Sequence, residues 1–383
     1  MKNLFVRLNS CCGFGRLSTA EVISKSPLMV NLHSRHSRLL SRPRVLLLIL
    51  TGLLYLSGCG LLGTRKQVQV PPLLTPLIEA NRAQLIAEVN RLAAVKSIRG
   101  KVDIQFEDTS FADVGIAEKY RQADGTITLQ RPGKVYLIIQ VPFIATDIAQ
   151  MTSDGESFRV AVLQGEEKYR RFVKGTNNAI YEKLELNGTG SEAGKNKKKT
   201  MTGKETVSAL SNLRPQHLTE AFMISSVGSQ SSLAYSQSEF FQEEPDIRPR
   251  AKKGSRIVRG YYLLEEFLPT SADEMRLLRR FWFDRVGAIR LARLQTYNDR
   301  GLLITDISYW DDKAVGSDGR KLPSRIDITR PHDQYRLSIS YQAPASMDID
   351  REFRPEAFVL ENRWQLPEVD LDAPQNKRAK VSQ

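Results

Sequence analysis

The chain has few of the residues that build disulfides, metal centres and nucleophilic active sites. Its 383 residues include only 3 cysteines and 4 histidines. His217 and His332 are the only histidines after residue 59, and no ligand pattern surrounds either of them. A metal site or a catalytic triad needs several such groups close together. We therefore expect a non-enzymatic protein with no metal site, no catalytic residues and no cofactor.

The sequence also lacks the common signatures of phosphate binding and ester hydrolysis. It contains no G-x-S-x-G segment, and the pairs Gly194-Lys195 and Gly203-Lys204 lack the other residues of a phosphate loop. The formal net charge is +13, but the part after residue 59 is only mildly basic. The lysines between 195 and 204 have no aromatic residues among them, which argues against stacking on nucleic-acid bases. A solvated loop and contact with anionic lipid both explain these lysines, and we expect no nucleic-acid partner.

One long apolar run is present, from Val45 to Cys59. Four arginines precede it closely, and no acidic residue lies between Met29 and Cys59. A basic region, an apolar stretch and a small-residue cleavage site together define a secretory signal. The stretch is shorter than the roughly 20 residues of a membrane-spanning helix, and a short uncleaved anchor is the alternative interpretation. Met29 could start a complete signal, so residues 1–28 are either an over-extended start or a long basic region.

The end of this run, Leu56-Ser57-Gly58-Cys59, resembles the lipobox of bacterial lipoproteins. The resemblance implies that the chain is cut before Cys59, that its thiol receives a diacylglycerol and that the new amine is acylated, for example with palmitate. Residues 1–58 would then be the signal peptide. Gly60 follows in place of the aspartate that marks inner-membrane retention, which favours an anchor in the outer membrane facing the periplasm. The processed chain would contain no disulfide, because Cys59 is its only cysteine.

Residues 59–74 resemble a tether, and a helix is expected after it. Thr75 and Pro76 are typical of an N-cap and a first helical position. The apolar residues that follow recur with helical spacing, which predicts an amphipathic helix over 76–96 that packs on a sheet. They are Ile78, Leu85, Val89, Leu92 and Val95.

The apolar period changes to two after residue 97, which predicts an antiparallel meander with short turns. A first group of strands is expected at Val102–Phe106, Lys119–Gln130, Val135–Val141, Asp147–Thr152, Phe158–Leu163 and Tyr169–Val173. A second group is expected at Ile257–Phe267, Arg276–Asp284, Ala288–Tyr297, Leu302–Trp310, Lys321–Thr329 and Tyr335–Tyr341. Between them, 175–254 is interpreted as an insertion with flexible parts and a short helix at Pro215–Ile224. The pattern predicts a mainly β protein with some α structure (α+β), a curled antiparallel sheet of about eleven strands, and a polar tail at 369–383.

This order of elements resembles the lipoprotein carrier and receptor family, the LolA/LolB-like fold, over residues 75–368. The segment G-T-I-T-L-Q-R-P-G-K-V (125–135) resembles the carrier's strand, Arg-Pro turn and strand, and V-Y-L-I-I-Q-V-P-F-I-A-T (135–146) resembles the receptor's strand and loop. The family implies a half-open barrel, lidded by helices, that binds acyl chains in an apolar cavity. In the receptor this loop carries an exposed leucine. Phe143 and Ile144 occupy the matching place here, where they would either enter lipid or cap the barrel mouth.

The N-terminal helix would be the lid of such a barrel, and inward-facing strand residues would line its cavity. The candidates are Ile104, Phe106, Ile127, Leu129, Val135, Leu137 and Ile139. The leading hypothesis is a receptor-like outer-membrane lipoprotein that transfers lipid or lipoproteins. Its partners would be the membrane through the N-terminal lipid, phospholipid or acylated lipoproteins as cargo, and a periplasmic carrier protein. The alternative is a structural or assembly lipoprotein of the cell envelope that acts through protein–protein contacts.

Overall fold

The computed structural model describes residues 70–109, 118–119, 122–165, 167, 170–177, 213–271 and 273–373. The chain divides into two compact units, Met1–Gln69 and Val70–Gln383. The first unit lies outside the described residues, and with it the signal peptide, Cys59 and most of the tether. These features therefore remain predictions. Among the described residues, no helix combines the length and the apolar character needed to cross a membrane.

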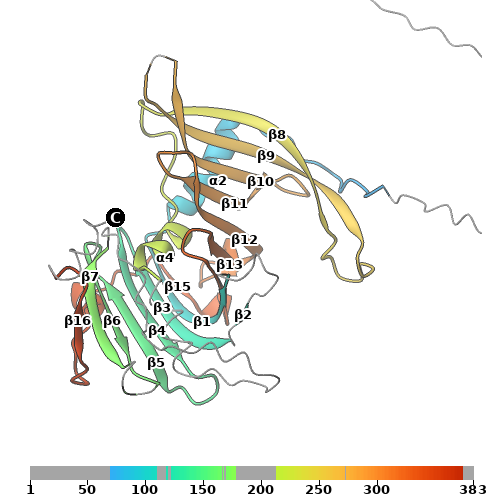
Figure 1. Ribbon diagram of the computed structural model, residues 1–383. Helices are drawn as coiled ribbons and strands as arrows, with labels where there is room; N and C mark the ends of the chain where they lie inside the picture. Colours follow the sequence, from blue (N-terminus) through green and yellow to red (C-terminus); the bar gives the residue numbers. More distant parts are fainter. Residues whose placement is uncertain are drawn as a thin grey trace, which may run out of the picture. The chain divides into compact units, whose positions relative to one another are not determined.

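The second unit is built around one 16-stranded sheet (Figure 1). The strands follow the order β16-β7-β6-β5-β4-β3-β1-β14-β13-β12-β11-β10-β9-β8, with β2 and β15 paired to β1 outside this path. All neighbours are antiparallel except β16, which is parallel to β7. The expected mainly β fold is confirmed as a large curled sheet, which is open because β16 and β8 stand at opposite ends of its path. The sheet has more strands than the roughly eleven predicted.

The elements have the following bounds. The first half contains α2 (Arg82–Ala93), β1 (Ser97–Asp108), β2 (Glu118–Lys119), β3 (Ala123–Gln130), β4 (Lys134–Gln140), β5 (Asp147–Ser153), β6 (Ser157–Val162) and β7 (Arg171–Thr176). The second contains α4 (Pro215–Phe222), β8 (Ala234–Pro245), β9 (Arg256–Pro269), β10 (Met275–Asp284), β11 (Arg290–Tyr297), β12 (Leu303–Val315), β13 (Arg320–Arg330) and β14 (Tyr335–Tyr341). The short 3-10 helices η3 (Pro344–Ser346) and η4 (Pro355–Phe358) and the strands β15 (Asp348–Ile349) and β16 (Glu368–Asp370) follow.

Pairing of β1 with β14 joins the two meanders into a single sheet. Ile104 lies opposite Ile339 and Phe106 opposite Leu337, and all four side chains belong to one buried cluster. The alternation of apolar and polar residues that predicted these strands also decides which side chains enter the core. A shift of register by one residue would move this apolar set to the other face, so the pattern fixes the pairing.

Helix α2 begins later than the sequence predicted. Asn81, not Thr75, is the N-cap, and it forms a capping box with Gln84. The preceding residues are used in the sheet, since Leu74 N donates to Val258 O and Val258 N donates to Pro72 O, each at 2.9 Å. Local capping signals favoured Thr75, whereas pairing with β9 holds this segment extended.

The predicted flexible insertion contains two ordered elements. The short helix expected at 215–224 is present as α4, which contacts β4, β5 and β13 (Figure 1). Residues 234–245 form β8, a twelve-residue strand along β9, so this stretch is not a flexible insertion. The expected polar tail likewise begins with ordered residues, because Asp370 lies in β16 and Leu371 is buried. Residues 178–212 lie outside the described residues.

Candidate functional site

The apolar face of β1, β3 and β4 gathers all seven side chains predicted to line a cavity. In the register of these strands, Ile127 lies opposite Leu137 and Leu129 opposite Val135. Each of the seven is at most 9% exposed, and all belong to the main core cluster. The seven residues therefore form one buried apolar surface. Whether this face receives a ligand is a separate question, which depends on what covers it.

A short segment from another part of the chain completes this core. We call residues 213–227 the plug; it contains α4 and the residues on either side of it. Seven apolar side chains of the plug are buried in the same cluster as the strand residues. They are Leu213, Leu218, Ala221, Phe222, Met223, Ile224 and Val227. The lid predicted for the N-terminal helix is not confirmed, although α2 also buries Leu85, Val89 and Leu92 in this core.

Four polar side chains hold the plug by its backbone, and one of them, Arg279 on β10, donates to Ser225 O at 3.2 Å. The Arg131 guanidinium donates to Met223 O at 3.1 Å and Ile224 O at 2.8 Å, and also to Val95 O next to α2 at 2.8 Å. Asn90 makes a reciprocal pair of hydrogen bonds with the backbone of Val227, at 3.0 and 2.9 Å. The Tyr309 hydroxyl donates to Ala221 O at 3.0 Å. These bonds join the plug to α2, to β10, to β12 and to the turn between β3 and β4.

The cation of Arg131 has no carboxylate partner in the part of the chain that the structure describes. Burial lowers the pKa of Arg131. Its charge is compensated by three carbonyl oxygens, which supply partial negative charge only. Because this half-buried cation has no counter-ion, its desolvation offsets part of the energy of its hydrogen bonds.

The apolar side chains of the plug are packed among the described residues, since each of the seven is at most 6% exposed. A cavity of about 20 Å³ remains among α2, the plug and strands β12 to β14, lined by Leu92, Phe222 and Tyr341 among others. This volume is about that of one water molecule and is far too small for an acyl chain. Among the described residues, the apolar face is therefore covered by the protein's own side chains.

His217 lies on the buried side of α4, where its Nδ1 is 2.6 Å from the Tyr335 hydroxyl oxygen. Burial, with help from the charges of Arg330 and Arg214, holds the pKa of His217 well below its usual value. The imidazole is neutral in the folded protein at neutral pH. Protonation would place a charge among the apolar residues of the plug, so the plug is expected to be sensitive to acid.

Acidification is therefore expected to destabilise the fold through His217. In the unfolded chain the imidazole of His217 takes up a proton near pH 6.5, whereas in the folded chain it does not. The contribution of His217 to the free energy of unfolding is therefore complete above that pH and is lost as the pH falls below it. The free energy of unfolding should fall by up to about 1.4 kcal/mol per pH unit in this window. Urea denaturation between pH 7.5 and pH 5 measures the slope. His217→Gln should flatten it, and His332→Gln, which changes an exposed histidine, should not; equal slopes in both variants would contradict the assignment.

The loop between β4 and β5 places its apolar side chains in solvent. Phe143 is 102% exposed and Ile144 is 72% exposed. The loop is closed at its base by a hydrogen bond from Val141 N to Thr146 O of 2.9 Å. Phe143 has a φ of +67°, a left-handed conformation that is unfavourable for an aromatic residue. In the described conformation the loop therefore does not cap the barrel mouth, which was one of its two interpretations.

The sequence did not single out Arg131, the plug or Asn90 as functional. Arg131 was visible only as part of an Arg-Pro-Gly turn. Its partners Met223 and Ile224 come from more than ninety residues further along the chain, and only the fold brings them together. The described residues contain no group of three or more His, Cys, Asp or Glu side chains that could hold a metal ion.

Comparisons with known proteins give distant structural matches only. No protein-family model matches the sequence, and neither does any curated protein. A LolA superfamily protein from Nitrosomonas europaea matches with 11% identity and a TM-score of 0.36, over 74% of this chain and 99% of that chain. A DUF1329 family protein from Desulfovibrio piger matches with 10% identity and a TM-score of 0.37, over 72% and 95%. An outer membrane lipoprotein-sorting protein domain from Vibrio parahaemolyticus matches with 9% identity and a TM-score of 0.35, over 72% and 94%.

The names of the first and third structures agree with the resemblance noted in the sequence. The superpositions are too distant to give any residue of this chain a role.

Proposed function

We propose that this chain is a lipid-anchored protein of the cell envelope that takes an acyl chain into the apolar face beneath the plug and delivers it to the membrane that holds its own anchor. One observation carries the proposal. A continuous apolar face on β1, β3 and β4 is covered by a separate short segment held through its backbone, and not by a second layer of sheet. Such a cover can leave without breaking a strand pair.

The anchor and the exposed loop support a receptor-like role at the outer membrane. The lipobox ending in Cys59 provides the anchor, and residues 73 and 74 are already bound along β9. The free tether between Cys59 and Pro72 spans at most about 45 Å when fully extended. The folded unit therefore stays close to one bilayer, and Phe143 and Ile144 can contact that bilayer. The cargo would be phospholipid or an acylated lipoprotein passed on by a periplasmic carrier.

Native mass spectrometry of the chain from residue 60 onward tests this function. After incubation with a diacylated peptide or with phospholipid, we expect a complex of one acyl-bearing molecule per chain that survives transfer to the gas phase. Leu218→Trp enlarges a fully buried plug residue. It should weaken the closed state and raise the ligand-bound fraction severalfold, because overpacking costs about 1–3 kcal/mol.

The filled interior favours a second candidate, a structural or assembly lipoprotein that acts through its surface. The cavity of about 20 Å³ beside the plug fits such a protein. If neither the parent chain nor the Leu218→Trp variant takes up acyl ligand, the transfer function is wrong and this second candidate stands.

A further inference from the structure

The connection between β8 and β9 extends past the neighbouring strand. We call this ten-residue connection, residues 246–255, the hairpin loop (Figure 1). The last pair between β9 and β10 joins Tyr261 to Asp284, and β9 begins five residues before Tyr261. A hydrogen bond of 2.9 Å from Asp246 N to Ser255 O closes the base of the loop. The hairpin loop is thus an ordered tip that lies beyond the end of β10.

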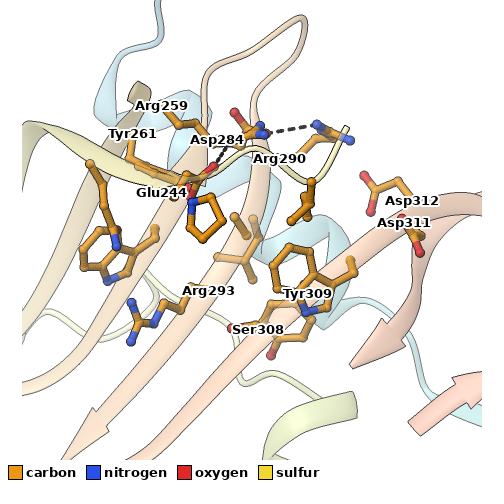
Figure 2. A pocket seen from close by; sticks show the side chains of 17 residues that line it. Glu244, Arg259, Tyr261, Asp284, Arg290, Arg293, Ser308, Tyr309, Asp311 and Asp312 are labelled. Atoms are coloured by element: carbon orange, nitrogen blue, oxygen red, sulfur yellow. Dashed lines mark hydrogen bonds and ion pairs between the residues drawn. The ribbon is translucent and has the colours of Figure 1, made fainter. Parts of the chain in front are cut away.

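Next to the loop, the charges of the strands are paired with one another. Glu244 and Asp284 both bind Arg259, the latter at 2.8 Å, in the lining of a cavity on the outer face of the sheet, opposite the main core (Figure 2). This cavity has a volume of about 510 Å³. Glu243 is paired with Arg256, the first residue of β9. These carboxylates are therefore already neutralised by arginines of the same strands.

The hairpin loop itself carries three cations without a partner. Of its charged residues, Asp246 and Arg248 are paired with each other at 2.8 Å. The other three are exposed and make no ion pair or side-chain hydrogen bond with any residue that the structure describes. They are Arg250, Lys252 and Lys253. The loop therefore presents about three unneutralised positive charges within four residues of the chain.

An apolar side chain stands beside these cations. Ile247 is 70% exposed, and the loop contains no aromatic residue on which a nucleic-acid base could stack. A basic segment next to a membrane is attracted to the phosphate groups of anionic lipid. An exposed isoleucine among the cations adds apolar surface that the lipid can cover. The composition of the loop thus fits an anionic membrane surface better than nucleic acid.

The tether joins the fold close to this loop. Val258 N donates to Pro72 O at 2.9 Å, and Leu73 is bridged to Val258. Lys253 is five residues before Val258, which is at most about 18 Å along the chain. The tether from Cys59 to Pro72 also has a limited reach, at most about 45 Å. A bilayer that holds the anchor is therefore within reach of the hairpin loop.

We propose that the hairpin loop binds the phosphate groups of anionic phospholipid through Arg250, Lys252 and Lys253, with Ile247 in contact with the lipid below them. The loop would fix the orientation of the folded unit on the bilayer that holds its anchor. The inference rests on the membrane attachment in the proposed function, but not on acyl transfer. It differs from the contact by Phe143 and Ile144, which needs no charge on the lipid.

Vesicle binding by the chain from residue 60 onward, which includes the whole compact unit Val70–Gln383, tests the charges. The vesicles are phosphatidylglycerol mixed equally with phosphatidylcholine, and phosphatidylcholine alone. The triple variant Arg250→Gln, Lys252→Gln, Lys253→Gln should bind the anionic vesicles about a hundredfold more weakly at low ionic strength, since each cation near an anionic leaflet contributes about fivefold. Its binding to uncharged vesicles should stay within twofold of the parent.

A second triple variant is the matched control for net charge. Lys101→Gln, Arg300→Gln, Arg354→Gln also removes three positive charges, from exposed positions outside the loop that have no ion pair among the described residues. It should weaken binding to the anionic vesicles less than tenfold. Equal weakening by the two variants would show a general attraction between the chain and the membrane, and full binding by the loop variant would show none through the loop. Either result would overturn the proposal.

A fluorescent label locates the contact. The chain from residue 60 onward has no cysteine, so Ile247→Cys provides a single site for an environment-sensitive nitrobenzoxadiazole dye. Its emission should rise and shift to the blue on the anionic vesicles, whereas the same dye at Leu302→Cys, where the parent residue is 59% exposed, should not respond. An unchanged signal at residue 247, or a stronger response to hexaglutamate than to the vesicles, would overturn the proposal. Both experiments omit acyl ligand, so their failure is distinct from a failure of acyl uptake.

Discussion

Replacing Phe143 and Ile144 together by aspartate should weaken binding of the chain from residue 60 onward to phosphatidylcholine liposomes by about a thousandfold. Each side chain is exposed in the described structure, and burial of each in lipid contributes roughly 2 kcal/mol. Losing both contributions amounts to about 4 kcal/mol, and each 1.4 kcal/mol is tenfold in affinity. Liposome flotation over a range of lipid concentrations measures the change. Uncharged vesicles exclude a contribution from the basic residues of the chain.

The protein itself should tolerate these substitutions. Phe143 has a positive φ, a conformation that aspartate adopts more readily than phenylalanine does. The thermal midpoint of the variant should therefore be unchanged or slightly higher, and a loss of binding can be attributed to the loop and not to unfolding.

Phe240 and Phe241 on β8 provide the matched control for this loop. They are 41% and 48% exposed, so their replacement by aspartate also removes exposed apolar surface, about half as much as in the loop, from a different place. Liposome binding by this control should stay within a few-fold of the parent. If the loop variant binds as well as the parent, or if both variants lose binding equally, the β4–β5 loop is not the membrane contact.

The strands could be predicted from the sequence where one face of each is buried. Val135, Leu137 and Ile139 alternate with half-buried residues, and the pattern gives both the strand and its inward face. β8 was missed because it has no buried face: in Ala234–Pro245 no side chain is fully buried, and charged and aromatic residues follow each other without a period of two. Its strand conformation comes from pairing with β9, a contact that periodicity does not reveal.

The parts that sequence analysis missed depend on residues far apart in the chain. The Thr75-Pro76 start of the helix was wrong because the segment before Asn81 has a partner on β9. The plug was recognised only as a short helix, since an amphipathic octapeptide gives no sign of the surface it covers. The cavity on the outer face takes its lining from five strands, and none of its charged residues is unusual in its own sequence context.

Replacing Arg131 by methionine should release the plug. Methionine keeps an unbranched apolar side chain but removes the two hydrogen bonds to the plug, at Met223 O and Ile224 O, together with the one to Val95 O. A hydrogen bond from a charged donor contributes about 1.5–3 kcal/mol, and part of this is offset because the cation no longer has to be desolvated. A net loss of about 3 kcal/mol would raise the open population by roughly a hundredfold. Amide hydrogen exchange of residues 213–227 should accelerate by that factor, while exchange in β13 and β14 stays near the parent rate.

Ligand uptake should follow the same equilibrium if the plug covers the acyl site. When the competent state is a small fraction of the population, the apparent affinity rises in proportion to that fraction. The methionine variant should therefore bind a diacylated peptide up to about a hundredfold more tightly than the parent.

Two variants separate this effect from a general loss of stability. Arg131→Lys retains the charge but not the fork of donors, and should give an intermediate rise in affinity. Arg99→Met removes an exposed arginine of β1 that lies over the Phe353 ring and has no hydrogen bond to the plug among the described residues, and should change neither exchange nor uptake. Faster exchange of the plug without tighter acyl binding would mean that the plug opens onto a face that takes no ligand. The apolar face would then be a structural core, and the chain an envelope protein that acts through its surface.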